Sequence, residues 1–330
     1  PLHGPHQRLN AAADRVSVPQ LLPVLGRASS ARGYRLPGFG VVVVLAPRVL
    51  PGTGDVFKVL RAPRHRVRTE VRNPGQVFVF DEGGELDAIE RIARDNHLCL
   101  IEDSCEALGS AWKGRSCGGW GDVGAFAFYP NKQITTGEGG CVVTQSADIA
   151  ALCRSMRNQG RGEKGVWLAH ERLGYNYRIA DINCALGISQ LRRLDRIIAM
   201  RADAAQRYHM LLNEVPEVIA PIILPDVTRM SWFVYVVRLS DEFVRADRDW
   251  LIEWLAEHGI ESRPYFTPIH LQPFYAREFG YRSGDFSVTE SVSDRTISLP
   301  FFTRIAPEQQ KIVVEMLKDG LAARRKELAS

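Results

Sequence analysis

Hydrophobic and polar residues follow regular patterns only from about residue 77 onward. Apolar runs over 77–80 and 98–101 predict two strands, and apolar residues recur at helical spacing over 86–93 between them. Two strands joined by a helix form a βαβ unit, in which the strands lie parallel in one sheet. The pattern therefore predicts an α/β fold.

A second pair of strands encloses a lysine. Apolar runs over 123–128 and 141–144 predict the strands, and the segment between them contains Lys132 followed by glycines that can take positive φ and close a tight hairpin. No carboxylate lies within five residues of Lys132 on either side. Desolvation on such a turn favours the uncharged amine, which is the form that makes an imine with a carbonyl group. An ordinary solvated lysine is the alternative that these residues leave open.

Capping residues and periodicity predict the remaining elements: a helix from Ser146 to about Asn158, a long helix from Ala180 that ends before Pro216, a strand over 232–239, a helix over 249–257 and a terminal helix from Pro307. A long helix in this place commonly links a large domain to a small one. We therefore predict a large domain over 76–213 and a compact α+β domain over 214–330. Trp232, Phe233 and Tyr235 are expected in the core of the latter.

Composition excludes several classes of protein. The 330 residues are 45% hydrophobic and 24% charged, as in an ordinary globular protein, and no apolar run approaches the length of a membrane span. The start lacks the basic and apolar regions of a signal peptide. The six cysteines form no CxxC pair and show no ligand spacing with histidine, so no metal site is expected. These features predict a cytoplasmic protein with reduced thiols.

Residues 1–75 differ from the rest of the chain. They contain eleven arginines and one lysine against three acidic residues, and nine of the eighteen prolines. A nucleic-acid-binding arm is disfavoured because aromatic residues that could stack on bases are nearly absent. A divergent first part of the large domain is a second interpretation. We favour a third, a segment foreign to the fold such as an out-of-frame translation, and the start at Pro1 suggests an altered beginning.

Four segments carry a family resemblance: FAFYPNKQITTGEGG, IEDSCEALGS, GYNYRIADI and RPYFTPIHLQPFY. They resemble motifs of the pyridoxal-phosphate-dependent nucleotide-sugar aminotransferases (the DegT/StrS family, fold type I) over roughly 77–317. The resemblance implies a mostly parallel sheet between helices, a small C-terminal domain and a homodimer with shared active sites. It also implies pyridoxal 5'-phosphate as the cofactor, and transfer of an amino group from L-glutamate to a keto nucleotide sugar, with the 4-keto-6-deoxy type favoured.

The resemblance assigns roles around the cofactor. Lys132 would form the imine with the cofactor and later move a proton. Asp103, at the end of the strand over 98–101, would keep the pyridine nitrogen protonated; taken alone, it reads more readily as a helix N-cap. Glu106 stands at a position near the ring where relatives often have Gln or His.

Three further residues match the binding segments of the family. Asn176 would reach the partner's cofactor phosphate, and Arg178 the substrate's phosphates, for which its fork of donors is suited. Without the family, the pair reads equally well as a helix cap and a surface arginine. His270 matches a position near the sugar-nucleotide pocket, although a lone histidine in an apolar loop is more often structural.

The phosphate-binding part of the family pattern is incomplete. Ala127 replaces a serine that many relatives use for the cofactor phosphate, and Gly52-Thr53-Gly54, the only Gly-Thr upstream, is not followed by a helical pattern. We therefore expect this chain to bind the cofactor weakly or not at all. The alternative function is that of a non-catalytic relative that lost cofactor binding with its N-terminal part.

Overall fold

The structure is a computed structural model that describes residues 43–47, 95, 98–162 and 169–329. The strand predicted over 77–80, the helix over 86–93 and the Gly52-Thr53-Gly54 turn lie outside the described residues. Within the segment 1–75, only Val43–Pro47 is described, as strand β1. These five residues pair with a strand of the main sheet.

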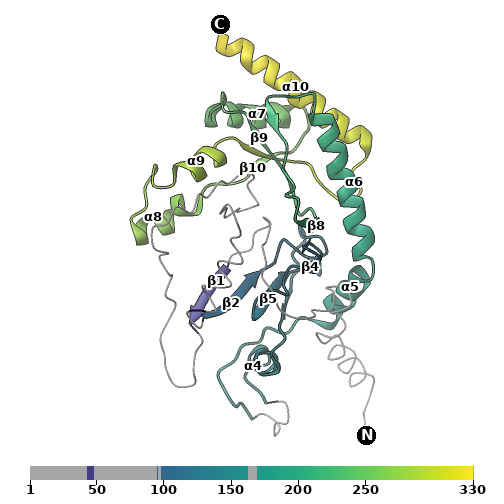
Figure 1. Cartoon of the computed structure of the whole chain (residues 1–330), viewed down its shortest axis with the longest axis vertical. Helices are drawn as coiled ribbons and strands as arrows, with labels where there is room; N and C mark the ends of the chain where they lie inside the picture. The colour runs from purple at the N-terminus through teal and green to yellow at the C-terminus, as the bar shows by residue number, and fades with distance from the viewer. Residues whose placement is uncertain (1–42, 48–94, 96–97, 163–168, 330) are drawn as a thin grey trace.

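That sheet has the strand order β1-β2-β5-β6. Its other members are β2 (Leu98–Asp103), β5 (Val123–Ala127) and β6 (Gly140–Val143). β2 and β5 run parallel, whereas β1 pairs with β2, and β6 with β5, in the antiparallel sense. The predicted strands are thus confirmed to within two residues at each end. The described part of the sheet is mixed, with one parallel pair at its centre (Figure 1).

Helix α4 (Ala147–Arg157) begins where the sequence predicts. The Ser146 hydroxyl accepts a hydrogen bond from the amide of Ile149 at 3.3 Å, which satisfies one of the free N–H groups of the first turn. The helix ends at Asn158, close to Gly160, which has a φ of +76°. Both predicted ends are confirmed.

The single long helix predicted from Ala180 is wrong. The chain forms two helices, α5 (Asp181–Leu191) and α6 (Leu194–Leu212), separated at Arg193, whose φ of −110° and ψ of 7° are not helical. The break lets each helix pack separately. α6 places Leu194, Ile198 and Tyr208 in the core, whereas Ile182 of α5 is 81% exposed in this chain. Periodicity alone did not distinguish one helix from two that share a hydrophobic pattern.

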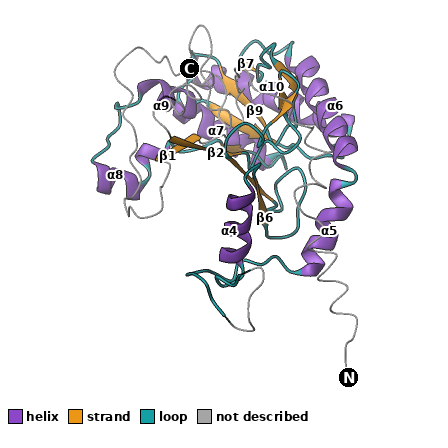
Figure 2. Cartoon of the chain, turned by 60° about the horizontal axis from the view of Figure 1, so that its bottom comes forward, coloured by secondary structure: helices purple, strands orange, loops and turns teal. Residues whose placement is uncertain are grey.

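The C-terminal part is built on an antiparallel sheet with the order β10-β11-β9-β7, flanked by two helices. The strands are β7 (Val218–Ile219), β9 (Tyr235–Leu239), β10 (Arg263–Pro264) and β11 (Thr296–Leu299). The flanking helices are α7 (Arg245–Glu257) and α10 (Pro307–Ala329). The terminal helix starts at Pro307 as predicted. Figure 2 shows these helices against the strands.

Two boundaries of this part differ from the prediction. The strand predicted over 232–239 begins only at Tyr235, because Trp232 has a φ of +51°, which is incompatible with an extended strand. The helix predicted over 249–257 begins earlier, at Arg245, where the Asp247 carboxylate accepts a hydrogen bond from the amide of Val244 at 2.9 Å. The aromatic residues expected in the core are buried there: Trp232, Phe233 and Tyr235 are at most 5% exposed.

Short elements complete the described chain. A small antiparallel sheet joins β4 (Arg115–Ser116), β3 (Ala111–Trp112) and β8 (Val227–Arg229). A 3-10 turn, η1 (Ile269–Leu271), leads to α8 (Pro273–Phe279) and α9 (Ser287–Ser293). No helix in the described ranges is long and apolar enough to cross a bilayer.

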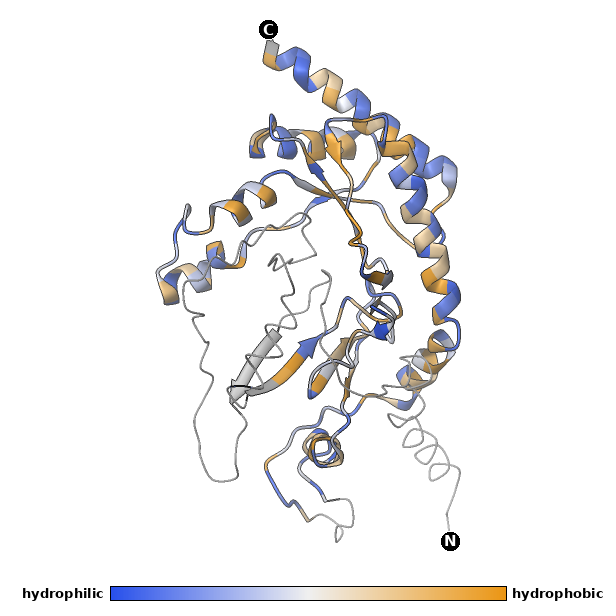
Figure 3. Ribbon diagram, in the orientation of Figure 1, coloured by the Kyte–Doolittle hydropathy of each residue, from blue (hydrophilic) through white to orange (hydrophobic). Residues whose placement is uncertain are grey.

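Among the described residues, the buried hydrophobic side chains form two clusters, and α6 contributes to both. Leu194 and Ile198 pack with Phe126 and Ile134 around the main sheet. Further along the helix, Tyr208 packs with residues of β9, β11, α7 and α10. Hydrophobic positions line β9 in Figure 3. The division of the chain into domains at residue 213 stays a prediction.

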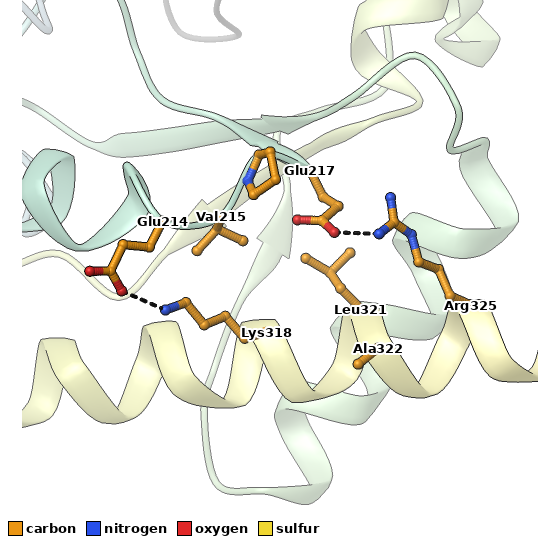
Figure 4. Close-up of a pocket in the computed structure, with 8 residues that line it drawn as sticks. Glu214, Val215, Glu217, Lys318, Leu321, Ala322 and Arg325 are labelled. Carbon is orange, nitrogen blue, oxygen red and sulfur yellow. Dashed lines mark hydrogen bonds and ion pairs between the residues drawn. The ribbon is translucent and has the colours of Figure 1, made fainter.

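A surface hollow lies between the end of α6 and α10 (Figure 4). Val215 and Leu321 line it, and ion pairs join Glu214 to Lys318 and Glu217 to Arg325 across it. None of the predicted site residues lines this hollow. The candidate site is therefore sought at the lysine turn.

Candidate active site

The hairpin that carries Lys132 closes tightly at the ends of β5 and β6. The amide of Lys132 donates to the Tyr129 carbonyl at 3.0 Å, and the amide of Phe128 donates to the Gly139 carbonyl at 2.8 Å. Gly139 has a φ of +144°, and a Cβ there would lie 2.6 Å from the Thr136 hydroxyl oxygen. A side chain at this position would force the turn open. The predicted hairpin is confirmed.

Helix α5 holds the far side of the turn. The Asn183 side chain donates to the carbonyl of Thr136, and the Gln190 side chain donates to the carbonyl of Thr135. Gln190 also accepts from the amide of Thr135 at 3.3 Å. Because these side chains satisfy backbone groups that the turn leaves free, they fix its conformation.

The Lys132 amine is paired with a carboxylate brought by the fold. Its Nζ lies 3.1 Å from Oε1 of Glu106, and the two side chains are 12% and 23% exposed. The same Nζ lies 4.2 Å from the centre of the Phe233 ring. The amine thus rests between an anion and an aromatic face, and is largely withdrawn from water. The solvated lysine that the sequence left open does not describe this environment.

Glu106 is held from several sides. The Gln133 side chain donates to its backbone carbonyl at 2.6 Å, and Tyr265 lies near its carboxylate. Burial raises the pKa of the Glu106 carboxyl, while Lys132 and Tyr265 oppose that rise. The carboxylate that the sequence could not orient is therefore turned toward Lys132.

Asp103 ends strand β2, next to Ala125 on the parallel strand β5. Its Oδ1 accepts a hydrogen bond from the amide of Cys105 at 3.2 Å, and the residues that follow form turns rather than a helix. Asp103 is therefore not a helix N-cap. Since β2 and β5 are parallel, their carboxyl ends share one edge of the sheet, where Asp103 meets the segment that leads to Lys132.

Asn176 and Arg178 lie elsewhere on the chain, beside the end of α4. The amide of Gln159 donates to the carbonyl of Tyr175 at 2.8 Å, and Asn158 forms an isolated antiparallel β-bridge with Asn176. Both predicted binding residues are exposed, and Arg178 Nε donates to Asn176 Oδ1 at 3.0 Å. Within the described part of this chain, neither side chain forms a hydrogen bond with Lys132.

His270 is buried in an aromatic cluster. It is 8% exposed, its Nε2 lies 2.9 Å from Oε1 of Glu290, and its ring centre lies 4.7 Å from that of Phe286. This environment accounts for a structural role. Its role in substrate binding stays a prediction.

Three residues of this site carried no sequence signal for it. Phe233 was expected only as core, and neither Tyr265 nor Gln133 was singled out. Phe233 and Tyr265 reach the lysine turn through tertiary contacts, and Gln133, which belongs to the turn, donates to the distant Ser231 at 2.8 Å. A pattern search along the chain does not reveal such contacts, because the partners lie far apart in sequence.

The comparison with protein families now decides the relationship. The model of the DegT/DnrJ/EryC1/StrS aminotransferase family matches residues 77–318. The chain belongs to this family. The resemblance stated from the four sequence segments is confirmed.

Curated relatives of the chain include sugar-modifying proteins. It is 32% identical to the GDP-perosamine synthase of Caulobacter vibrioides over 288 residues, which cover 87% of this chain and 74% of the relative. It is 31% identical to the spore coat polysaccharide biosynthesis protein SpsC of Bacillus subtilis, covering 71% of this chain and 63% of the relative. An uncharacterized protein of Methanocaldococcus jannaschii is 34% identical, and the match covers 73% of this chain and 64% of that protein. The chain thus spans less than two thirds of the last two relatives.

Solved structures give the same fold. The aminotransferase TlmJ from Streptoalloteichus hindustanus matches with a TM-score of 0.65 at 28% identity, covering 73% of this chain and 63% of that chain. DesV from S. venezuelae matches with a TM-score of 0.64 at 30% identity, covering 72% of this chain and 61% of that chain. The predicted fold class, the fold type I of pyridoxal-phosphate-dependent transferases, is confirmed.

The described residues fit the ring and carbonyl end of the family's cofactor, pyridoxal phosphate. The Lys132 amine and the Asp103 carboxylate lie at the same edge of the sheet. The Ser104 hydroxyl, fully buried beside Asp103, forms no hydrogen bond with the described residues. An unsatisfied buried hydroxyl points to a polar partner that the described residues do not supply. The phosphate-binding turn expected upstream lies outside the described residues, and weak cofactor binding stays a prediction.

Proposed function

We propose that this chain transfers an amino group from L-glutamate to a keto nucleotide sugar, of the 4-keto-6-deoxy type, with pyridoxal phosphate as cofactor. The donor leaves as its keto acid, and its amino group replaces the carbonyl oxygen of the sugar. The names of the relatives support the substrate class, since they include two kinds of sugar-modifying enzyme, GDP-perosamine synthase and UDP-4-amino-4,6-dideoxy-N-acetyl-beta-L-altrosamine transaminase.

One observation carries the proposal. The Lys132 amine is largely buried on a rigid hairpin, 3.1 Å from the Glu106 carboxylate and at the sheet edge that Asp103 ends. An amine held in this way is positioned to link covalently to a carbonyl compound. A lysine on a solvated surface loop would have neither the anchored turn nor the buried partner.

Each residue would then do a distinct task. When bound, pyridoxal phosphate supplies an electron sink for the carbon that exchanges its proton. Lys132 would bind the cofactor through its amine and, once displaced by the amino donor, would move the proton. Asp103 would hold a proton on the ring nitrogen, and Phe233 would shield the amine from water. Glu106 would orient the amine from the opposite side.

We assign the binding of the cofactor and substrate phosphates to the exposed residues Asn176 and Arg178. Asn176 and Arg178 project from a surface segment whose neighbours Leu173, Tyr177 and Ile182 are at least 73% exposed. We assign this segment to the interface of a homodimer, from which Asn176 would reach the partner's cofactor and Arg178 the substrate's phosphates. His270 is assigned to the sugar-nucleotide side of the site.

Covalent trapping tests the function. The purified chain is incubated with pyridoxal phosphate, reduced with borohydride and digested, and the modified peptide is identified by mass spectrometry. We expect the label on Lys132, and conversion of glutamate to 2-oxoglutarate by the unreduced protein. Lys132→Ala should lose both, whereas Lys113→Ala, which changes a half-exposed lysine of another turn, should keep both.

Repeating the trapping at a series of cofactor concentrations separates the two functions that the sequence left open. A label on Lys132 at near-stoichiometric level with glutamate turnover supports the aminotransferase. A correctly folded chain that takes no label at any cofactor concentration would instead be the non-catalytic relative. Full glutamate turnover by Lys132→Ala would overturn the assignment of the lysine.

A further inference from the structure

A buried arginine of α6 binds the segment that carries Phe233. Arg201 is 5% exposed, and its Nε donates a hydrogen bond to the Trp232 carbonyl at 2.6 Å. Its Nη2 donates to the next carbonyl along the chain, that of Phe233, at 2.7 Å. Both distances are short, as is usual for hydrogen bonds from a charged donor. One side chain of α6 therefore holds two successive carbonyls just before β9.

This segment has a backbone conformation that needs support. Trp232 has a φ of +51°, in the left-handed region, where a bulky residue stays only if its surroundings hold it there. Its ring packs against those of His209 and Tyr235, with ring centres 5.7 Å apart in each pair. The chain changes direction at Trp232, and the ring centre of Phe233 comes to lie 4.2 Å from the Lys132 amine. The position of Phe233 therefore depends on what holds this turn.

Arg201 is a cation in the interior of the protein. Its hydrogen-bond acceptors within the described ranges are the two carbonyls and the Thr303 hydroxyl, at 3.3 Å, and none of them is a carboxylate. The guanidinium also lies 4.9 Å from the centre of the Phe301 ring. Burial lowers the pKa of Arg201 to about 10, which leaves it charged at neutral pH. Because an apolar side chain would fill this space without the cost of burying a charge, the arginine indicates a task at the carbonyls.

The start of the same segment is fixed from another side. The Gln133 side chain donates to the Ser231 hydroxyl at 2.8 Å, and the Ser231 amide donates to the Ser110 hydroxyl at 3.1 Å. These contacts hold the residue before the turn. Arg201 holds the turn itself, from α6.

We propose that Arg201 is a positioning residue of the candidate active site, which acts through Phe233. Its guanidinium binds the carbonyls of Trp232 and Phe233 and so keeps the Phe233 ring against the Lys132 amine. Lysine cannot replace it, because an ammonium group lacks the planar fork that reaches both carbonyls. Displacement of the ring exposes the amine to water. This inference rests on the proposed function, in which Lys132 is the reacting amine.

Fluorine NMR on the full chain, without cofactor, measures the position of the ring. One preparation carries para-fluorophenylalanine in place of Phe233 alone, and a second carries it in place of Phe243, a buried residue of the C-terminal core. We expect Lys132→Met to move the Phe233 resonance, because the amine lies 4.2 Å from that ring. In Arg201→Lys the Phe233 resonance should move and lose its response to Lys132→Met. The Phe243 resonance should stay unchanged.

A matched control and a second variant keep the test decisive. Arg196→Lys makes the same chemical change on the exposed face of α6 and should move neither resonance. If Arg201→Lys does not fold, Arg201→Met, which fills similar space without a charge, replaces it with the same expected result. A Phe233 resonance that keeps its position and its response in the Arg201 variant overturns the proposal, and so does an equal shift at Phe243. A Phe233 resonance that ignores Lys132→Met overturns it without any Arg201 variant.

The inference and the function can fail separately, because the NMR measurement needs no cofactor. Borohydride trapping reports whether Lys132 binds the cofactor, and the resonance reports whether Arg201 positions Phe233. A resonance that depends on Arg201, without trapping, would refute the function and keep the positioning. Trapping with a resonance independent of Arg201 would refute the positioning and keep the function.

Discussion

The Gln133 side chain donates a hydrogen bond to the hydroxyl of Ser231 across 2.8 Å, and both residues are buried. Gln133 directly follows Lys132, whereas Ser231 lies between β8 and β9, before a strand of the C-terminal sheet. Ser231 is fixed in turn by the hydroxyl of Ser110, also at 2.8 Å. The lysine turn is therefore attached to the C-terminal part of the chain by a buried polar network.

This contact predicts the effect of Gln133→Ala. The change removes the side-chain donor to the Glu106 carbonyl and one of the two donors to the Ser231 hydroxyl, and we expect the free energy of unfolding to fall by about 1–3 kcal/mol. Urea unfolding measures this effect. Gln206→Ala, on the exposed face of α6, should change stability by less than about 0.5 kcal/mol, and an equal loss in both variants would refute the role of the network.

A second prediction concerns acid stability and the pair formed by Glu290 and His270. Hydrogen bonds from the amide of Gly284 and from His270 lower the pKa of the Glu290 carboxyl from 4.5 to about 2. Because the folded chain favours the ionised carboxylate, its stabilisation is fully present above pH 4.5 and is lost as the pH falls toward about 2.

Glu290→Gln should therefore be less stable than the wild type at pH 7, and the difference between them should shrink as the pH falls from 4.5 to about 2. Unfolding midpoints measured at several pH values check this. Glu278→Gln, which changes a half-exposed carboxylate of α8, should show no such convergence. A gap between wild type and Glu290→Gln that stays constant with pH would contradict the assignment.

A third prediction tests whether sites are shared between subunits. Lys132→Ala and Arg178→Ala chains are each expected to be inactive, and mixing them with subunit exchange should restore about a quarter of wild-type turnover. The reason is that random pairing in a two-fold dimer makes half of the dimers mixed, each with one intact site. Mixing Lys132→Ala with a chain that carries both changes should restore nothing. If mass spectrometry verifies the exchange and no activity returns, Arg178 and Lys132 belong to a site built from one subunit.

How far the sequence predicted the site depends on the range of the contacts. The hairpin around Lys132 was predicted correctly because its glycines and flanking apolar runs act over a few residues. Ser146 was recognised as a cap for the same reason. By contrast, the break at Arg193 escaped prediction, since both halves of that segment continue one hydrophobic pattern and contain neither glycine nor proline at the break.

The sequence by itself determined the family, the α/β class and the lysine at the centre of the candidate site, because these depend on local patterns and on motifs in a fixed order. Only the tertiary structure decided the surroundings of that lysine. Glu106, Phe233 and Tyr265 come from three separate segments, and they meet at Lys132 because the parallel pair β2–β5 and the C-terminal sheet are packed around one turn. Charge and burial at a point in space are properties of that packing, and the order of residues along the chain does not contain them directly.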